Sequence, residues 1–334
     1  MRRFLSLLLL SVLVLGGCAF TEPEEQVYEH FVNMDTEFTL HTEDVDAVFV
    51  KMFTAHPEQL VHLNTVSAKP TAFGYKVTLD YANEEVKADS VLCGTEQEVA
   101  LKALAQTLKA GESWGVMVLK GCEEPTPEEY SKQLAQENYL VTMGLKGAQW
   151  QLVRNDFTKD ILVTYSLEYQ GEIDTILKYR HEVQSKITDL AAQLWNEETA
   201  DEERVRAIHD CIIQMTKYYE GAGDVLIDNT PYGPLVKGRG VCDGYTYTAK
   251  LLLDAAGIEN RVVTGTALGE NHSWNMVKLG EKYYHMDVTW DDPVDRTGVD
   301  HLTYEYYLKS DTFMRGNHLW NSIEVPACEA NYKN

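Results

Sequence analysis

The sequence predicts an α+β fold for the C-terminal half of this 334-residue chain, in which a helix that begins at a cysteine packs on an antiparallel sheet. Residues 242–256 carry apolar side chains at helical spacing, and Gly257 follows in a position that commonly ends a helix. Segments 272–279 and 282–290 alternate polar and apolar residues, which is typical of half-buried strands. Gly280 lies between them, so we expect a β-hairpin.

The N-terminal half is predicted to form one or two small α+β domains at residues 27–172, after a linker at 18–26, with a separate C-terminal domain at 173–334. Two stretches with similar patterns suggest a duplicated unit, although chance periodicity is the alternative. Each stretch is a strand followed by a helix, predicted at 76–81 and 97–109 and again at 161–169 and 178–195.

The composition is that of an ordinary globular protein, with 44% hydrophobic and 24% charged residues. Acidic residues outnumber basic ones by 52 to 29, which gives a formal net charge of −23. Such a surface repels phosphate backbones, so we expect no nucleic-acid partner. The acids are spread along the chain, as in a solvated surface. The cysteines and histidines lack the spacing of a zinc site, and no metal or cofactor is predicted.

The first residues resemble an export signal of the bacterial lipoprotein type. Arg2 and Arg3 precede an apolar run, 4–15, that is too short to span a bilayer. Small residues then lead to Cys18, in the sequence Leu-Gly-Gly-Cys, where cleavage after residue 17 would leave this cysteine to carry lipid. We therefore expect a protein anchored by lipid in the bacterial cell envelope and facing outside the cytoplasm. A plain secretory peptide is the alternative.

The other cysteines carry weaker predictions. Disulfides are permitted outside the cytoplasm, and Cys93 with Cys122 is the pair that we expect to be worth testing, because both lie in one predicted domain. Cys211 and His209 lie on a predicted helix without a partner motif, so we interpret them as packing or surface residues. Cys328 has no assigned role.

Three residues form the candidate catalytic site. Cys242 lies in the first turn of the predicted helix, where unpaired backbone N–H groups and the helix dipole favour a thiolate and could stabilise an oxyanion. His272 begins one strand of the hairpin and Asp287 lies near the far end of the next, so an antiparallel pairing brings them together. A thiol, an imidazole base and an orienting carboxylate make up a nucleophilic triad. His285 is the second choice for the base, and a buried structural cysteine is the alternative for Cys242 alone.

The motifs around these residues resemble the transglutaminase-like superfamily, in its bacterial thiol-hydrolase branch. They read GRGVCDGY from residue 238, NHSWN from 271 and YYHMDVTWDDP from 283, within a resemblance that spans about 201–320. The resemblance implies a papain-like core and a nucleophile, a base and an orienter at the three positions named above. It also implies an aromatic or amide side chain upstream that completes an oxyanion hole, for which Tyr232 is the candidate.

Some cross-linking members of that superfamily require calcium. The acidic residues that follow the orienting aspartate could supply ligands, but they lack the Asp-x-Asp-x-Asp-Gly pattern of a calcium loop, so we expect solvated acids. These residues are Asp291, Asp292, Asp295 and Asp300.

The predicted function is acyl transfer at an amide bond by a membrane-anchored thiol enzyme. Hydrolysis by a peptidase or amidase is favoured over cross-linking, because water needs no second binding site. The expected partner is a protein or peptide substrate, including those of the cell envelope. Two alternatives remain: a protein cross-linking transglutaminase, and a surface-anchored binding protein that keeps the fold without turnover.

Overall fold

The computed structural model describes residues 22–81, 91–122, 127–155, 157–221, 223–293 and 302–333. These residues divide into two compact units. One runs to Val91 and includes Arg154–Asp160, and the other comprises Leu92–Val153 and the chain from Ile161 onward. Among the described residues, no helix is both long and apolar enough to cross a bilayer. The predicted export signal and Cys18 lie outside them.

The first unit is a small α+β domain. Its antiparallel sheet has the strand order β1-β3-β2, and phenylalanines of the helices, among them Phe31, Phe49 and Phe53, are buried. The elements are α1 (Pro23–Val32), β1 (Glu37–Leu40), α2 (Val45–Ala55), η1 (Pro57–His62), β2 (Leu63–Thr71) and β3 (Gly74–Tyr81). The predicted linker at 18–26 therefore ends early. Pro23 starts α1, because proline suits the first turn of a helix and two glutamates follow it there.

The second unit begins with a four-stranded sheet in the order β4-β5-β7-β6. β4 and β5 are parallel, whereas β5 and β7 are antiparallel. α3 packs on this sheet and buries residues such as Leu104 and Leu108. The elements are β4 (Leu92–Thr95), α3 (Glu96–Ala110), β5 (Trp114–Lys120), α4 (Pro127–Glu137), α5 (Tyr139–Thr142), β6 (Leu145–Arg154) and β7 (Ile161–Tyr169).

Two features of this half concern the predicted repeat and the cysteine pair chosen for testing. The strand and helix of the first predicted repeat fall in different units, since β3 belongs to the first and α3 to the second, and the duplicated unit stays a prediction. Cys93 and Cys122 are both thiols.

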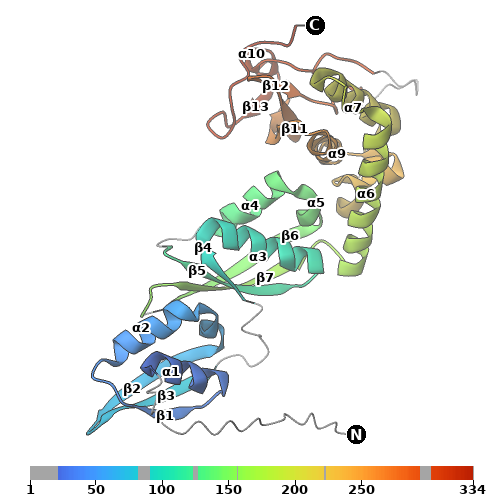
Figure 1. The fold of residues 1–334 in the computed structure, drawn as a ribbon. Helices are drawn as coiled ribbons and strands as arrows, with labels where there is room; N and C mark the ends of the chain where they lie inside the picture. Colours follow the sequence, from blue (N-terminus) through green and yellow to red (C-terminus); the bar gives the residue numbers. More distant parts are fainter. Residues whose placement is uncertain are drawn as a thin grey trace, which may run out of the picture. The chain divides into compact units, whose positions relative to one another are not determined.

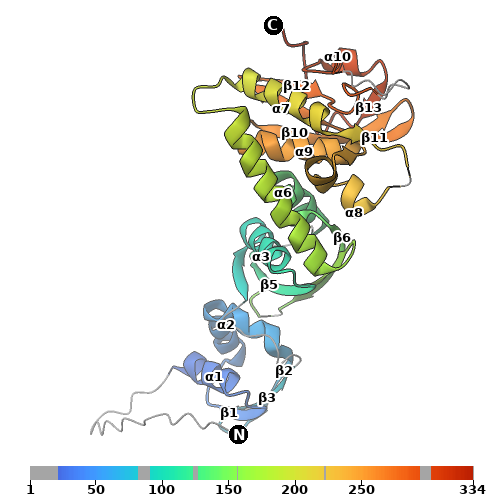
Figure 2. The ribbon, with the colours of Figure 1, turned by 90° about the vertical axis from the view of Figure 1, so that its right-hand side faces the viewer.

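The rest of the second unit packs three long helices beside a second sheet (Figure 1). α9 lies against β10 and β11 on one side and against α6 and α7 on the other (Figure 2). The helices are α6 (Ile173–Leu194), α7 (Asp201–Met215), α8 (Val225–Asp228), α9 (Cys242–Ala255) and α10 (Asp311–Met314), with η3 at Gly233–Lys237. The strands are β8 (Lys217–Tyr218), β9 (Arg239–Gly240), β10 (Asn260–Ala267), β11 (Glu270–Leu279), β12 (Lys282–Met286) and β13 (His318–Trp320).

This arrangement confirms the predicted α+β fold. The sheet is antiparallel in the order β12-β11-β10-β13, and the helix that packs on it begins at Cys242. Gly257 follows this helix with φ +72°, and Gly280 has φ +60° in the turn of the predicted hairpin. The boundary expected at residue 173 coincides with the start of α6, which lies inside the second unit. There α5 packs against both α6 and α9.

Candidate active site

Cys242 is the first residue of α9, at the point where an extended segment turns into the helix. The preceding strand β9 pairs with β8, which brings Tyr218 opposite Gly240. The glycine two residues after the cysteine is required by packing. A Cβ on Gly244 would lie 2.6 Å from the Asp228 carbonyl oxygen. The second glycine of the GVCDGY motif thus allows the first turn of α9 to pack closely against the backbone of α8.

Hydrogen bonds next to the predicted residues fix α9 against β11. Ser273 Oγ donates to Asp243 Oδ1 over 2.6 Å, and Thr246 Oγ1 donates to the Ser273 carbonyl oxygen over 2.9 Å. Asp243 follows Cys242 in the chain, and Ser273 follows His272. These bonds therefore hold the helix that carries the thiol and the strand that carries the imidazole in one position.

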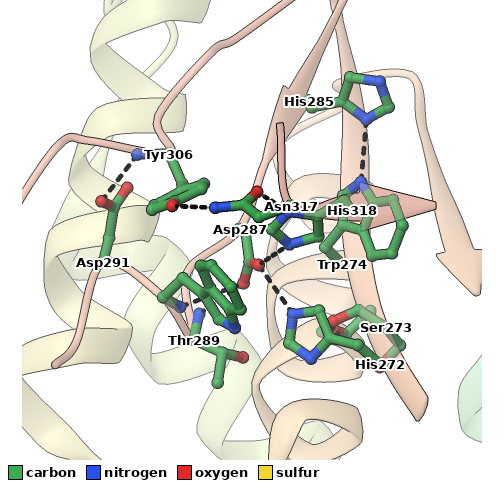
Figure 3. A network of polar contacts seen from close by, with 12 residues as sticks. His272, Ser273, Trp274, His285, Asp287, Thr289, Asp291, Tyr306, Asn317 and His318 are labelled. Atoms are coloured by element: carbon green, nitrogen blue, oxygen red, sulfur yellow. Dashed lines mark hydrogen bonds and ion pairs between the residues drawn. The ribbon is translucent and has the colours of Figure 1, made fainter. Parts of the chain in front are cut away.

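The structure brings the three predicted residues together. His272 Nε2 lies 2.7 Å from Asp287 Oδ2 (Figure 3), and Cys242 lines the same cleft as this imidazole, close enough for its sulfur to raise the pKa of His272. Asp287 immediately follows β12, which ends at Met286 and not at the predicted residue 290, and is fully buried. The imidazole thus stands between a carboxylate and a thiol, which is the geometry that proton transfer from the thiol requires.

Burial and hydrogen bonding act in opposite directions on these groups. Burial disfavours a charged His272, but its hydrogen bonds to Asp287 and Cys242 outweigh this effect and raise its pKa to about 9. Burial likewise disfavours a charged Asp287, yet the hydrogen bonds from His272 and His318 hold its pKa below the ordinary value. At neutral pH the site therefore favours an ionised carboxylate and an imidazolium.

The Asp287 carboxylate has four hydrogen-bond donors. Its Oδ1 accepts from the backbone N–H groups of Thr289 and Trp290, at 3.1 and 3.2 Å. Its Oδ2 accepts from His272 and also from His318 Nε2, at 3.0 Å. These bonds compensate for the cost of burying the charge and fix the direction in which the carboxylate faces His272.

His318 is a site residue that the sequence reasoning missed. It lies on β13 and is fully buried (Figure 3). Its Nδ1 lies 2.6 Å from Asn317 Oδ1, and the amide of Asn317 donates to the hydroxyl of Tyr306. No motif or spacing rule connects it with Asp287, 31 residues earlier, because only the pairing of β13 with β10 brings it there.

His285, the second choice for the base, is occupied elsewhere. Its Nδ1 accepts from Trp274 Nε1 and its Nε2 faces Asp311 Oδ1, both at 2.9 Å. The Trp274 N–H group leaves the imidazole proton on Nε2, so this nitrogen donates to Asp311. Burial lowers the pKa of His285. A neutral imidazole with both nitrogens engaged in this way does not serve as the base.

Two clusters of potential metal ligands occur among the described residues. In the first, His272 and His318 both direct Nε2 at one oxygen of Asp287, so hydrogen bonds account for the arrangement. The second joins His285 and Asp311 with Cys328. The proton that Trp274 keeps on His285 Nε2 opposes metal binding there, since a ligating nitrogen must be unprotonated.

The prediction that Tyr232 completes the oxyanion hole is wrong. Its ring is buried and stacks on Tyr179 with 3.6 Å between ring centroids, away from the residues that line the cleft at Cys242. Tyr218 lines this cleft instead. No sequence pattern indicates Tyr218, because β8 has only two residues and its position is set by its pairing with β9.

Two of the acidic residues beyond the hairpin, Asp291 and Asp292, are buried, not solvated as expected. Asp291 accepts from His209 Nε2 at 3.1 Å and from the N–H of Tyr306 at 2.9 Å. Asp292 accepts from the Tyr245 hydroxyl at 2.6 Å. His209 is itself buried between Asp210 and Asp291; burial opposes its charge, but these carboxylates raise its pKa. Asp295 and Asp300 lie outside the described residues.

A cleft of about 480 Å³ opens at Cys242 and His272. One wall is formed by the turn between β10 and β11, including Leu268 and Glu270, and another by the segment after β12, including Trp290. The candidate nucleophile and base are therefore both accessible to a substrate.

One comparison with known proteins covers the segment that carries this site. Residues 188–288, which include the cysteine helix and the hairpin as far as the aspartate, match the family model of the Transglutaminase-like superfamily. The chain is similar to this superfamily over those residues. No curated protein is similar enough to count as a relative.

Solved structures that resemble the chain are remote. A transglutaminase (TGase) crystal structure shares 14% sequence identity, with a TM-score of 0.30, and the match covers 57% of this chain and 54% of the chain in that structure. A candidate cysteine protease of Cytophaga hutchinsonii shares 14% sequence identity, with a TM-score of 0.28, and the match covers 43% of this chain and 65% of that protein. A candidate protease of Parabacteroides distasonis shares 10% sequence identity, with a TM-score of 0.25, and the match covers 52% of this chain and 39% of that protein. The chain thus spans less than two thirds of each of these proteins.

Proposed function

We propose that the transglutaminase-like domain is a thiol hydrolase that cleaves amide bonds in proteins or peptides, with Cys242 as nucleophile, His272 as base and acid, and Asp287 as orienter. The observation that carries this proposal is one cleft that holds both the Cys242 thiol and an imidazole hydrogen-bonded to a buried carboxylate. The matching family model supports a cysteine-type enzyme at the level of the superfamily.

The first half of the reaction forms a thioester. His272 takes the proton of the Cys242 thiol, and the sulfur attacks the amide carbonyl carbon. The imidazolium then protonates the leaving nitrogen, the C–N bond breaks and an amine departs. Asp287 keeps the imidazole proton on Nε2, so that Nδ1 is the nitrogen that exchanges protons with the thiol.

Donors at the start of α9 would stabilise the negative charge that develops on the carbonyl oxygen. The backbone N–H of Cys242 is one candidate, because the first N–H groups of a helix lack partners within it. The hydroxyl of Tyr218, in the same cleft, is the other. In the second half of the reaction, water gives a proton to His272 and attacks the thioester, which releases the acid and restores the thiol.

Alkylation by iodoacetamide tests the nucleophile. We expect Cys242 to react first in the native protein, at a rate that changes little between mildly acidic and neutral pH, because the imidazolium persists up to about pH 9. Cys211 is the internal control, since burial raises the pKa of its thiol. In a His272→Gln variant the rate at Cys242 should rise steeply with pH. Equal labelling of the two cysteines at mildly acidic pH, located by mass spectrometry, contradicts the proposal.

We also propose that lipid on Cys18 anchors the enzyme to a membrane of the bacterial cell envelope, facing outside the cytoplasm. The basic and apolar residues before this cysteine support the proposal. Expression in a bacterial host followed by membrane fractionation tests it. The parent chain should sediment with membranes and the Cys18→Ala variant should not, whereas equal distribution of the two contradicts a lipid anchor.

A further inference from the structure

The turn between β10 and β11 has an unusual residue at its first position. Ala267 pairs with Glu270, so the loop consists of Leu268 and Gly269, with φ of +49° and +88°. Two consecutive positive φ angles are typical of a type I′ turn, for which asparagine, aspartate or glycine is preferred at the first position. A leucine is strained in this conformation, because its Cβ crowds the backbone.

Nothing within the described fold offsets this strain by burying the side chain. Leu308 has the same left-handed conformation, at φ +50°, but its side chain is 1% exposed and belongs to the hydrophobic core. Leu268 is 78% exposed. It therefore combines an unfavourable backbone conformation with an apolar side chain in water, and both features oppose stability.

The turn is nevertheless held firmly beside the site. The N–H of Leu268 donates to the carbonyl oxygen of Asn317 over 2.9 Å, and Asn317 precedes His318 in the chain. Leu268 lines the same cleft as Cys242 and His272. The backbone that carries this side chain is therefore fixed at the cleft that the candidate nucleophile and base also line.

We propose that Leu268 contacts the substrate and selects amides with an apolar side chain next to the scissile carbonyl. The proposal rests on the proposed function. An apolar group in the cleft would cover the exposed leucine, with Trp290 and Pro293 as further apolar lining. Charge points the same way: among the described residues that line the cleft, Glu270 and Asp292 are carboxylates and none is lysine or arginine. A substrate with an acidic side chain there is disfavoured.

Peptidyl chloromethyl ketones test this selection, because they alkylate the nucleophile directly and require no known substrate. Three N-acetylated reagents with leucine, glycine or glutamate next to the ketone would be compared by their second-order rates of reaction at Cys242, followed by intact mass. We expect the order leucine, glycine, glutamate. Replacing Leu268 by asparagine should lower the leucine-to-glycine ratio of rates by about tenfold, the scale of an apolar contact in a pocket.

Thermal unfolding shows whether a change in the ratio of rates comes from lost substrate contact or from a destabilised fold. Leu268→Asn should raise Tm, because asparagine tolerates the left-handed conformation, while the ratio of rates falls. The control is Leu319→Asn. Leu319 is also exposed, at 63%, on the neighbouring strand β13, but does not line the cleft, so this change should leave the ratio as it is.

The proposal is overturned if Leu268→Asn leaves the leucine-to-glycine ratio unchanged, or if Leu319→Asn lowers it equally. Reactivity towards iodoacetamide distinguishes this failure from a failure of the proposed function. If Cys242 reacts with iodoacetamide as expected and the ratio does not depend on Leu268, only the selection is wrong. If Cys242 is inert towards iodoacetamide, both proposals fail.

Discussion

Replacing Cys242 by alanine is expected to lower kcat/KM for amide hydrolysis by about 10⁴-fold or more, on any substrate that the parent protein cleaves. The sulfur is the atom that forms the thioester, and neither water nor a neighbouring side chain can replace it. The fold should persist, because Cys242 lies half-exposed in the first turn of α9 and alanine is compatible with a helix. Steady-state kinetics with purified protein, together with the far-ultraviolet circular dichroism spectrum, measures both effects.

The matched control is Cys211→Ala. Cys211 lies on α7, where its sulfur contacts that of Met215, and it takes no part in the proposed reaction. This change should leave kcat/KM within about a factor of two. If Cys242→Ala keeps the parent activity, or if both alanine variants lose it equally, Cys242 is not the nucleophile.

The second large effect is expected for Asp287→Asn, which should lower kcat by about 10⁴-fold, as the equivalent change does in a serine protease triad. The two backbone N–H groups on Oδ1 require an oxygen there, so the asparagine amide would direct its NH₂ group at the position of Oδ2. A donor at that position forces His272 Nε2 to accept. The imidazole proton then moves to Nδ1 and faces the thiol, so His272 cannot take the thiol proton.

His318→Gln provides the contrast. A glutamine amide can still donate to Asp287 Oδ2, so the carboxylate would keep its charge and its direction towards His272. We expect kcat to fall by about tenfold, the lower end of effects seen when the partners of site residues are changed. A nuclear magnetic resonance spectrum of the imidazole protons should show the changed tautomer of His272 in Asp287→Asn alone. If Asp287→Asn is no slower than His318→Gln, the carboxylate does not set the tautomer.

The parts of the site that could be predicted from the sequence depend on local patterns. The helix at Cys242 follows from apolar spacing over four turns and a terminal glycine, and the relation of His272 to Asp287 follows from a two-residue hairpin turn. In both cases residues close in sequence determine the geometry. A short connection fixes the strand register, and the register fixes which side chains meet.

The parts that could not be predicted depend on pairings between distant segments. Tyr218 and His318 lie on strands of two and three residues, which carry no periodic pattern and acquire their positions from β9 and β10. Tyr232 was chosen because it precedes the cysteine in the chain, but packing against Tyr179 turns its ring away from the cleft. The strand and helix of the first predicted repeat fall in different units for a similar reason, since spacing along the chain does not say which segments share a core.

The chain beyond Asp287 has a consequence for how such proteins are recognised. The family match ends at residue 288, thirty residues before His318. The C-terminal segment is held by backbone hydrogen bonds to residues near α10: the N–H of Asp311 donates to the carbonyl oxygen of Cys328, and the N–H of Tyr332 donates to that of Leu308. A gene interrupted after the aspartate codon would still encode all three residues of the triad. A survey that counts only those residues would score that product as an enzyme, although it lacks one of the two imidazoles that hold the carboxylate.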